Sequence, residues 1–133
     1  MNGQATSGSI GSIGSIGATG TAVAGAAAEA ISILIADDHE VVREGLVAMI
    51  NRQPGMRVVA QAANGAEAAA LWLEHRPDIA LVDLRMPELD GVGVITQVRT
   101  LNPRARVIIL TTFDGDEDIY RGMRAGARAY LLK

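Results

Sequence analysis

The sequence contains no cysteine and no long apolar run, and each absence excludes a class of protein. Without cysteine the chain can form neither a disulfide framework nor a thiolate metal site. The longest apolar stretch, residues 18–36, is mostly alanine and glycine and is interrupted by Glu29, so it is too weak for a membrane span. Residues 1–30 contain no lysine or arginine, so the charged start of a secretory signal is missing. We therefore expect a cytoplasmic protein that does not bind a membrane.

Aromatic residues are also scarce. The chain has one tryptophan, one phenylalanine and two tyrosines, although 49% of its residues are hydrophobic. Its core must therefore be built from valine, isoleucine, leucine and alanine, which suits a parallel sheet covered by helices. The net charge is -3, with acids and bases mixed along the chain, and this argues against nucleic-acid binding through a basic face.

The composition changes near Ile31 and predicts two regions. Residues 1–30 contain three tandem Ser-Ile-Gly units, an alanine-rich run and one charged residue, Glu29. Glycine and serine raise the cost of ordering and supply little to bury, so we expect a low-complexity, flexible N-terminal extension. Residues 31–133 form the predicted globular domain.

In this second region, β-branched runs alternate with helical patterns. The predicted strands are residues 31–36, 57–60, 79–83, 106–111 and 129–132. Apolar residues between them recur at the spacing of one helix face, and turn residues such as Asn64-Gly65 and Asn102-Pro103 separate the segments. Four strand–helix units and a fifth strand imply right-handed crossovers and an open parallel α/β sheet.

Polar residues follow four of the five predicted strands. Asp37 and Asp38 come after the first strand, Asp83 ends the third, Thr111 ends the fourth and Lys133 follows the fifth. Ligands of open α/β sheets bind beyond the carboxyl ends of the strands, near the point where the strand order reverses. We therefore expect these side chains to form one site.

The residue types at this site favour magnesium and phosphoryl chemistry. Clustered carboxylates repel one another unless they share a cation, and hard oxygen ligands suit Mg²⁺ better than zinc. Lys133 would neutralise one oxygen of a phosphoryl group, and Thr111 would form a hydrogen bond to another. Asp83 would be the nucleophile, because a carboxylate can form an acyl phosphate.

Four segments carry a resemblance to a known family: residues 33–39 (ILIADDH), 81–91 (LVDLRMPELDG), 110–111 (LT) and 125–133 (AGARAYLLK). In this order and spacing they resemble the receiver domain of bacterial response regulators. The Asp-Asp-His opening and the Gly-Ala-x-x-Tyr-Leu-Leu-Lys ending are most similar to the NarL/LuxR-type subfamily, which has a helix-turn-helix DNA-binding output. The resemblance spans residues 31–133.

This resemblance implies a fold and a function. The fold would be a flavodoxin-like (CheY-like) three-layer α/β sandwich with a parallel five-stranded sheet in the order 2-1-3-4-5. The domain would accept a phosphoryl group on Asp83 from a sensor histidine kinase, with Mg²⁺ as cofactor, and would switch conformation to control an output. It would be a regulatory domain, with self-catalysed phosphotransfer and dephosphorylation as its only chemistry.

The resemblance also implies which residues bind the metal and the phosphoryl group. Asp38 and Asp83 would bind Mg²⁺ through their side chains, and Asp37 would bind it mainly through water. The backbone carbonyl of Arg85 would complete the protein ligands. Lys133 would contact both the Asp83 carboxylate and the phosphoryl group.

Switch residues follow from the same resemblance. Thr111 would be the hydroxyl switch, and Tyr130 the aromatic residue whose rotamer changes with it. Plainer interpretations remain: Thr111 as an ordinary strand-end hydroxyl and Tyr130 as part of a static core. Asp90, before Gly91 and a helix, is expected to cap that helix, and His39 to be a solvated loop residue. Asp37 and Asp38 considered alone could equally cap the helix after them.

Two residues are expected to control the lifetime of the acyl phosphate. Arg85 and Phe113 lie two residues beyond the acceptor and the switch threonine, respectively. A long cation and a ring at these places would screen the acyl phosphate from water.

Three other functions compete with this interpretation. A nucleotide- or flavin-binding protein would need a glycine-rich turn where the chain has Asp-Asp-His-Glu. A hydrolase with an aspartyl-phosphate intermediate would need an acid two residues after the nucleophile, where the chain has Arg85. A receiver that only docks, without phosphorylation, would not need the complete acidic site.

The sequence ends at Lys133, before the proline and fifth helix that normally follow in the family. Any contact with DNA would therefore come from an output domain outside this chain. In the family's fold, the first and fifth helices cover one face of the sheet. We therefore expect strands one, three, four and five to be partly uncovered on that face. Self-association as a homodimer is the expected consequence, with residues 22–30 folding back over the face as the alternative.

Overall fold

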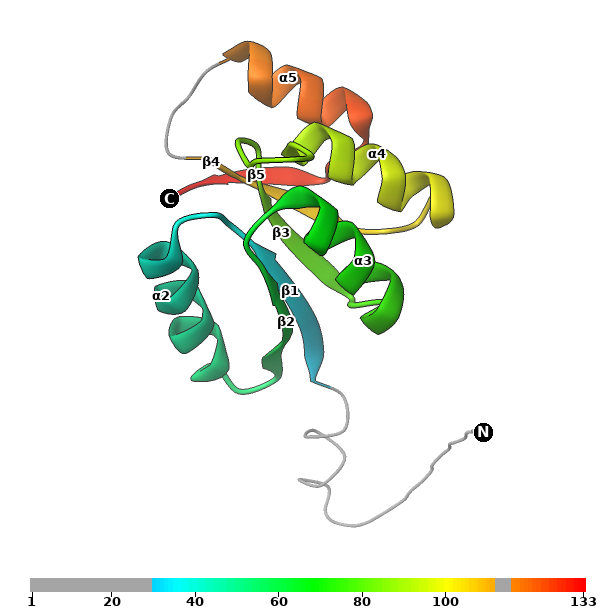
Figure 1. Cartoon of the computed structure of the whole chain (residues 1–133). Helices are drawn as coiled ribbons and strands as arrows, with labels where there is room; N and C mark the ends of the chain where they lie inside the picture. The colour runs from blue at the N-terminus through cyan, green and yellow to red at the C-terminus, as the bar shows by residue number, and fades with distance from the viewer. Residues whose placement is uncertain (1–29, 112–115) are drawn as a thin grey trace, which may run out of the picture. The chain divides into compact units, whose positions relative to one another are not determined.

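The computed structural model describes residues 30–111 and 116–133, and residues 32–133 form one compact unit. Helices and strands alternate along it, as Figure 1 shows. The strands are β1 (Ile31–Ala36), β2 (Met56–Ala62), β3 (Ile79–Asp83), β4 (Val107–Thr111) and β5 (Ala129–Leu132). The helices are α2 (Glu40–Asn51), α3 (Gly65–His75), α4 (Gly91–Leu101) and α5 (Asp116–Ala125). The predicted N-terminal extension lies almost entirely outside the described residues.

The five strands form one parallel sheet in the order β2-β1-β3-β4-β5, so the predicted α/β fold and strand order are confirmed. The register pairs Ala36 with Val82, Asp83 with Leu110, and Thr111 with Leu132. Because these pairs are the last in their ladders, the carboxyl ends of β1, β3, β4 and β5 reach the same edge. That edge carries the candidate site.

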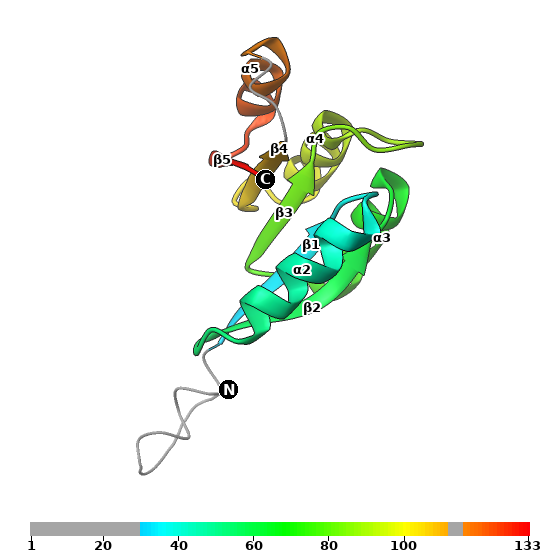
Figure 2. The same cartoon turned by 90° about the vertical axis from the view of Figure 1, so that its left-hand side faces the viewer.

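Helices cover both faces of the sheet and produce three layers (Figure 2). Leu34 and Ala36 of β1 point into the larger core cluster, which contains Trp72 of α3 and Ile95 of α4. The intervening β1 residues belong to a second cluster, which packs against α2. The helix α5 lies close to β4, because a Cβ added at Gly122 would be 2.3 Å from a side-chain atom of that strand.

The face of the sheet toward α2 is partly uncovered, as expected. Four large residues on this side are at most 7% exposed, because α2 packs three partly buried apolar residues against them: Ile33, Ile35, Leu81 and Leu110. On the same side, Ile79 of β3 and Ile108 of β4 are only partly buried, and Ile31 at the start of β1 is 40% exposed. The exposure is greatest at β5, where all four residues are exposed.

A capped helix start places the loop after the central strand β3. The Asp90 carboxylate accepts a hydrogen bond from the Gly93 backbone N–H at 2.9 Å, which confirms Asp90 as the N-cap of α4. The next residue, Gly91, donates from its backbone N–H to the Leu84 carbonyl at 2.9 Å. A Cβ at Gly91 would lie 2.5 Å from the Asp83 carbonyl oxygen, so the close approach of α4 to β3 requires glycine here.

Candidate functional site

Three carboxylates meet where β1 and β3 end. Asp37 and Asp38 directly follow β1, and Asp83 is the last residue of the neighbouring strand β3. One ligand atom from each of these residues and from His39 lies within 4.8 Å of the others. Asp37 and Asp83 are buried, whereas Asp38 and His39 are exposed. The cluster is therefore anchored in the protein on one side and open to solvent on the other.

Lys133, the only lysine in the sequence, bridges the two buried carboxylates. Its Nζ donates to Asp37 Oδ2 at 2.8 Å and to Asp83 Oδ2 at 3.1 Å. Its side chain is 6% exposed, although the residue as a whole is exposed at the end of β5. The Lys133 backbone N–H also donates to the Thr111 carbonyl at 2.7 Å, which fixes the residue beside β4. The strand β5 thus delivers the cation that offsets the charge of the acids.

The pKa values of the two carboxylates that share Lys133 are shifted in opposite directions. Burial alone would raise the pKa of Asp37, but hydrogen bonds from Lys133 and the His39 backbone, with the charge of Lys133, outweigh burial and lower it. For Asp83 burial prevails over its bonds to Lys133 and the Arg85 backbone, and the Asp37 charge adds to the effect, so its pKa is raised. Burial alone would lower the pKa of Lys133, but its hydrogen bonds to both carboxylates outweigh burial and raise it. The negatively charged form is therefore favoured more strongly at Asp37 than at Asp83.

His39 contacts the cluster more closely than its predicted place in a solvated loop implied. Its side chain is 62% exposed, as expected, but its Nδ1 lies 3.1 Å from Asp37 Oδ1 and 3.2 Å from Asp38 Oδ1. Its backbone N–H donates to Asp37 Oδ1 at 2.8 Å, and the residue is the N-cap of α2. The capping alternative for Asp37 and Asp38 does not hold, because neither is the N-cap. The direct succession Asp-Asp-His was the signal for this contact.

Arg85 faces a cavity of about 450 Å³ beside the exposed acid Asp38. Its backbone N–H donates to Asp83 Oδ1 at 3.2 Å, and its guanidinium forms an ion pair with Asp118 of α5. Asp118 also pairs with Arg121 at 3.5 Å. Sequence reasoning missed Asp118, since no local pattern connects α5 with the loop after β3. The role of the Arg85 backbone carbonyl as a metal ligand stays a prediction.

The two predicted switch residues lie on neighbouring strands. Thr111 ends β4 and is 8% exposed, next to Leu132 in the register of β5. Tyr130 on β5 is 48% exposed, so the interpretation of Tyr130 as static core is wrong. Their roles as switches remain predictions, and Phe113 lies outside the described residues.

The donors at this site fit a magnesium ion. Three carboxylates supply hard oxygen atoms, and the sequence has no thiolate that would favour a softer metal. The Asp38 carboxylate is exposed and accepts no bond from Lys133, and Lys133 bonds only to Oδ2 of Asp83, whose Oδ1 accepts from the Arg85 backbone N–H. Carboxylates as close as these are stabilised by a shared divalent cation.

Among the described helices, none combines the length and hydropathy that crossing a bilayer requires.

Fold and site together define a regulatory α/β domain with a carboxylate cluster at the carboxyl edge of its sheet. The family model of the response regulator receiver domain matches residues 33–133. The chain belongs to this family, and a receiver domain is the regulatory part of a response regulator rather than a catalytic one.

The individual proteins that resemble this chain are response regulators, and some of them belong to the LuxR family. The response regulator protein VraR of Staphylococcus aureus is 41% identical over 103 residues, which cover 77% of this chain and 49% of VraR. A LuxR-family response regulator from Aurantimonas sp. is 38% identical with a TM-score of 0.75, over 78% of this chain and 74% of that one. A CheX–CheY–BeF3–Mg²⁺ complex from Borrelia burgdorferi gives 26% identity and a TM-score of 0.71, over 77% and 78%. The chain spans about half the length of the curated relatives it matches.

Proposed function

We propose that this domain accepts a phosphoryl group on Asp83 from a sensor histidine kinase, with Mg²⁺ bound, and that the modification switches an output. The observation that carries the proposal is the Asp83 carboxylate itself. It is buried at the end of a central strand, is tied through Lys133 to Asp37, and lies within 4.8 Å of the exposed acid Asp38. Membership of the receiver family supports the same role.

The phosphoryl transfer exchanges one bond to phosphorus for another. An oxygen of Asp83 attacks the phosphorus of a phosphohistidine, an O–P bond forms, and the N–P bond breaks. The electron pair of the broken bond returns to the imidazole, which takes a proton from solvent. The Lys133 ammonium would stabilise the negative charge on the phosphoryl oxygens, and the Thr111 hydroxyl would form a hydrogen bond to one of them.

Asp38, Asp83 and the backbone carbonyl of Arg85 would hold the magnesium ion, with Asp37 acting mainly through water. The ion would neutralise charge on the transferring phosphoryl group. The related complex whose name includes CheY, BeF3 and Mg²⁺ supports this choice of metal. Within the chain, Lys133 keeps Asp37 and Asp83 in place, because it bonds to one oxygen of each.

The proposed output is transcriptional control through a DNA-binding domain beyond the matched segment. The names of the LuxR-family relatives support this output, and the chain as a whole has a net charge of -3, which does not favour direct DNA binding. In this account Thr111 would move toward the phosphoryl group, and Tyr130 on the next strand would change rotamer. The cytoplasm is the location that fits, because a histidine kinase draws its phosphoryl group from ATP inside the cell.

Self-association through β5 is also part of the proposal. The edge strand β5 exposes three large apolar side chains, which are 48–62% accessible: Tyr130, Leu131 and Leu132. An exposed apolar edge strand favours pairing with another chain. Light scattering on the full chain would show a dimer at micromolar concentration, and Leu132→Lys would shift it toward monomer. A monomer at every concentration would remove this part of the proposal.

Intact mass spectrometry tests the phosphoryl transfer. Incubation with Mg²⁺ and acetyl phosphate should add the mass of one phosphoryl group, and removal of Mg²⁺ with a chelator should prevent the addition. Asp83→Asn should take up none, while Asp90→Asn, which alters a helix cap instead, should still be labelled. An unmodified wild-type protein would favour the docking-only alternative, and steady release of phosphate with many turnovers would favour a hydrolase.

A further inference from the structure

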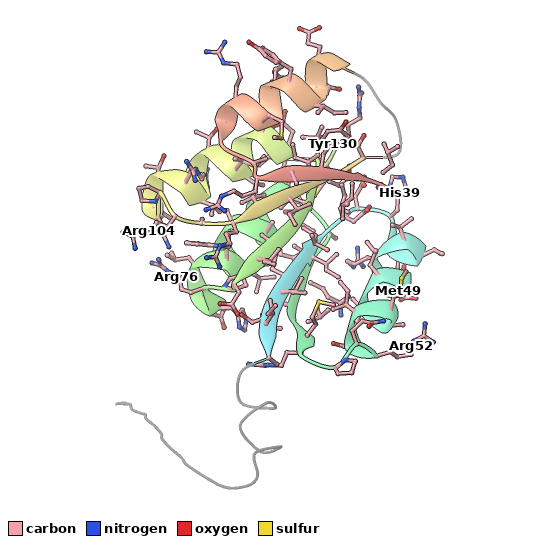
Figure 3. All side chains as sticks on the ribbon, turned by 180° about the vertical axis from the view of Figure 1, so that it is seen from behind. His39, Met49, Arg52, Arg76, Arg104 and Tyr130 are labelled. Carbon is pink, nitrogen blue, oxygen red and sulfur yellow. The ribbon has the colours of Figure 1, made fainter. Side chains whose placement is uncertain are left out.

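A second polar feature lies at the end of the sheet opposite the carboxylates. It is a cavity of about 270 Å³, formed by the last turn of α3, the segment before β3 and the turn between α4 and β4. Three arginines line it: Arg76, Arg104 and Arg106. Figure 3 labels two of them, Arg76 and Arg104, which lie together and far from His39. We call this cavity the basic hollow.

The arginines of the basic hollow have no acidic partner within the described part of the chain. Arg104 and Arg106 form no ion pair there, and Arg76 donates from Nε to the Leu73 carbonyl at 3.3 Å. The acid in the lining, Asp78, is occupied by Ser32, whose backbone N–H and hydroxyl donate to Asp78 Oδ2 at 2.8 and 3.1 Å. Three cations against one acid give the basic hollow a positive charge, in a chain whose net charge is -3.

Local structure holds the guanidinium of one of these arginines and the backbone of a second in place before any ligand arrives. The Arg76 guanidinium lies over the ring of Trp72, 4.8 Å from its centroid, and Trp72 is only 2% exposed. The Arg104 backbone N–H donates to Asn102 Oδ1 at 3.0 Å, within a turn that includes Pro103. Because that bond uses the amide oxygen of Asn102, the amide NH₂ remains as a donor. Hydrogen-bond donors that are already fixed in position lose less conformational entropy when a ligand binds.

Helix stability explains only part of this arrangement. Basic residues near a helix C-terminus interact favourably with the helix dipole, and Arg76 is the C-cap of α3. Arg106 directly precedes the strand β4 and has no such role. Its approach to the other two arginines costs repulsion, which the single carboxylate of the lining, Asp78, offsets only in part.

We propose that the basic hollow binds a small polyanion of the diphosphate class. Guanidinium groups match the tetrahedral oxygens of phosphate in pairs, and three of them fit a ligand with at least two negative charges. The volume of about 270 Å³ is slightly below the usual range of ligand pockets, which favours a compact ligand over an extended chain. The site lies apart from Asp83 and does not depend on the proposed phosphoryl transfer.

Calorimetry and tryptophan fluorescence with inorganic pyrophosphate test this proposal. Trp72 is the only tryptophan, so its emission reports directly on the Arg76 guanidinium that covers it. In buffer without Mg²⁺ we expect one saturable site, with a change in emission that follows the heat. Arg104→Gln and Arg106→Gln should each weaken binding about tenfold. Arg52→Gln is the matched control, because Arg52 is exposed at the end of α2 and does not line the cavity.

Each other outcome would overturn the proposal. Absence of saturable binding, or equal weakening in Arg52→Gln, would show that the basic hollow is only a solvated surface. Binding of citrate as tight as that of pyrophosphate would assign it to carboxylates instead. A single-stranded oligonucleotide that competes and binds more tightly would assign it to nucleic acid. Circular dichroism confirms that each variant is folded, and Arg104→Lys should restore part of the affinity because it returns the charge without the planar fork.

Discussion

Charged side chains of opposite sign cluster at the two ends of the sheet, and the two clusters differ in burial and in ion pairing. At the carboxyl end, Asp37 and Asp83 are buried and share the Lys133 ammonium. At the other end, the arginines of the basic hollow are exposed, and Arg104 and Arg106 have no acidic partner in the described ranges. A buried charge is costly unless it is paired, whereas an exposed charge keeps its water. The acidic end therefore depends on its internal cation, and the basic end does not depend on a partner to fold.

Lys133→Met should give the largest effect on stability. Removal of the ammonium leaves two buried carboxylates without their shared partner, and breaking a buried ion pair is strongly destabilising. We expect the free energy of unfolding in urea at pH 7 to fall by about 3 kcal/mol. Arg52→Met, at an exposed position, should change it by less than about 0.5 kcal/mol. Equal values for both variants would show that the acidic end does not depend on its cation.

Gly91→Ala should destabilise the loop that supports Asp83. The new Cβ would lie 2.5 Å from the Asp83 carbonyl oxygen and 2.7 Å from Leu84 Cα, which are backbone atoms that cannot rotate away. Overpacking of this kind typically lowers the free energy of unfolding by about 2 kcal/mol, and labelling of Asp83 should slow with it. Gly45→Ala is the control, because its added Cβ would have no atom within 4 Å beyond its chain neighbours and the backbone of its own helix. Alanine there should raise helix stability by about 0.5–1 kcal/mol, and a loss as large as that of Gly91→Ala would refute the steric explanation.

Arg85→Ala should change the lifetime of the acyl phosphate more than the stability of the fold. The Arg85 side chain is 80% exposed, so its ion pair with Asp118 contributes at most a few tenths of a kcal/mol to folding, on the order of other surface pairs. Because Arg85 lines the cavity beside Asp38, its removal should admit water and shorten the half-life roughly threefold. Loss of the phosphoryl group followed by intact mass measures the rate. Arg121→Ala removes the other partner of Asp118, and an equal effect there would assign the change to α5 instead of Arg85.

The titration of Asp83 separates the contributions of its neighbours by sign. In the metal-free protein, carboxyl NMR should show a pKa for Asp83 above the ordinary value of aspartate, because burial outweighs its bonds. Lys133→Met should raise this pKa further, since Lys133 favours the charged form. Asp37→Asn should lower it, because it removes a neighbouring negative charge. A shift in the same direction in both variants would contradict this account of the acidic end.

Much of the fold follows from the sequence because its signals are local and periodic. Continuous apolar runs predicted the buried strands, and the predicted bounds of β1, β3 and β5 agree with the structure. The strand β2 is longer than predicted, residues 56–62 instead of 57–60, because pairing in the sheet extends a strand beyond its most apolar residues. The boundary between the extension and the domain stays a prediction.

The acidic end was predictable because the carboxyl ends of parallel strands must meet. From that rule the sequence predicted that Asp37, Asp38 and Asp83 lie close together, and in the structure their ligand atoms lie within 4.8 Å of one another. The pair between Arg85 and Asp118 and the arginines of the basic hollow were not predicted. Each joins segments far apart in the sequence, so only the packed fold shows that they are neighbours.

Chemical trapping of the modified residue tests the central claim most directly. Sodium borohydride reduces an aspartyl phosphate to homoserine, which marks the acceptor in a peptide map. After treatment with Mg²⁺ and acetyl phosphate, we expect homoserine at position 83 and aspartate unchanged at positions 37, 38 and 90. Homoserine at one of those other positions, with aspartate intact at 83, would contradict the assignment of Asp83 as the phosphoryl acceptor.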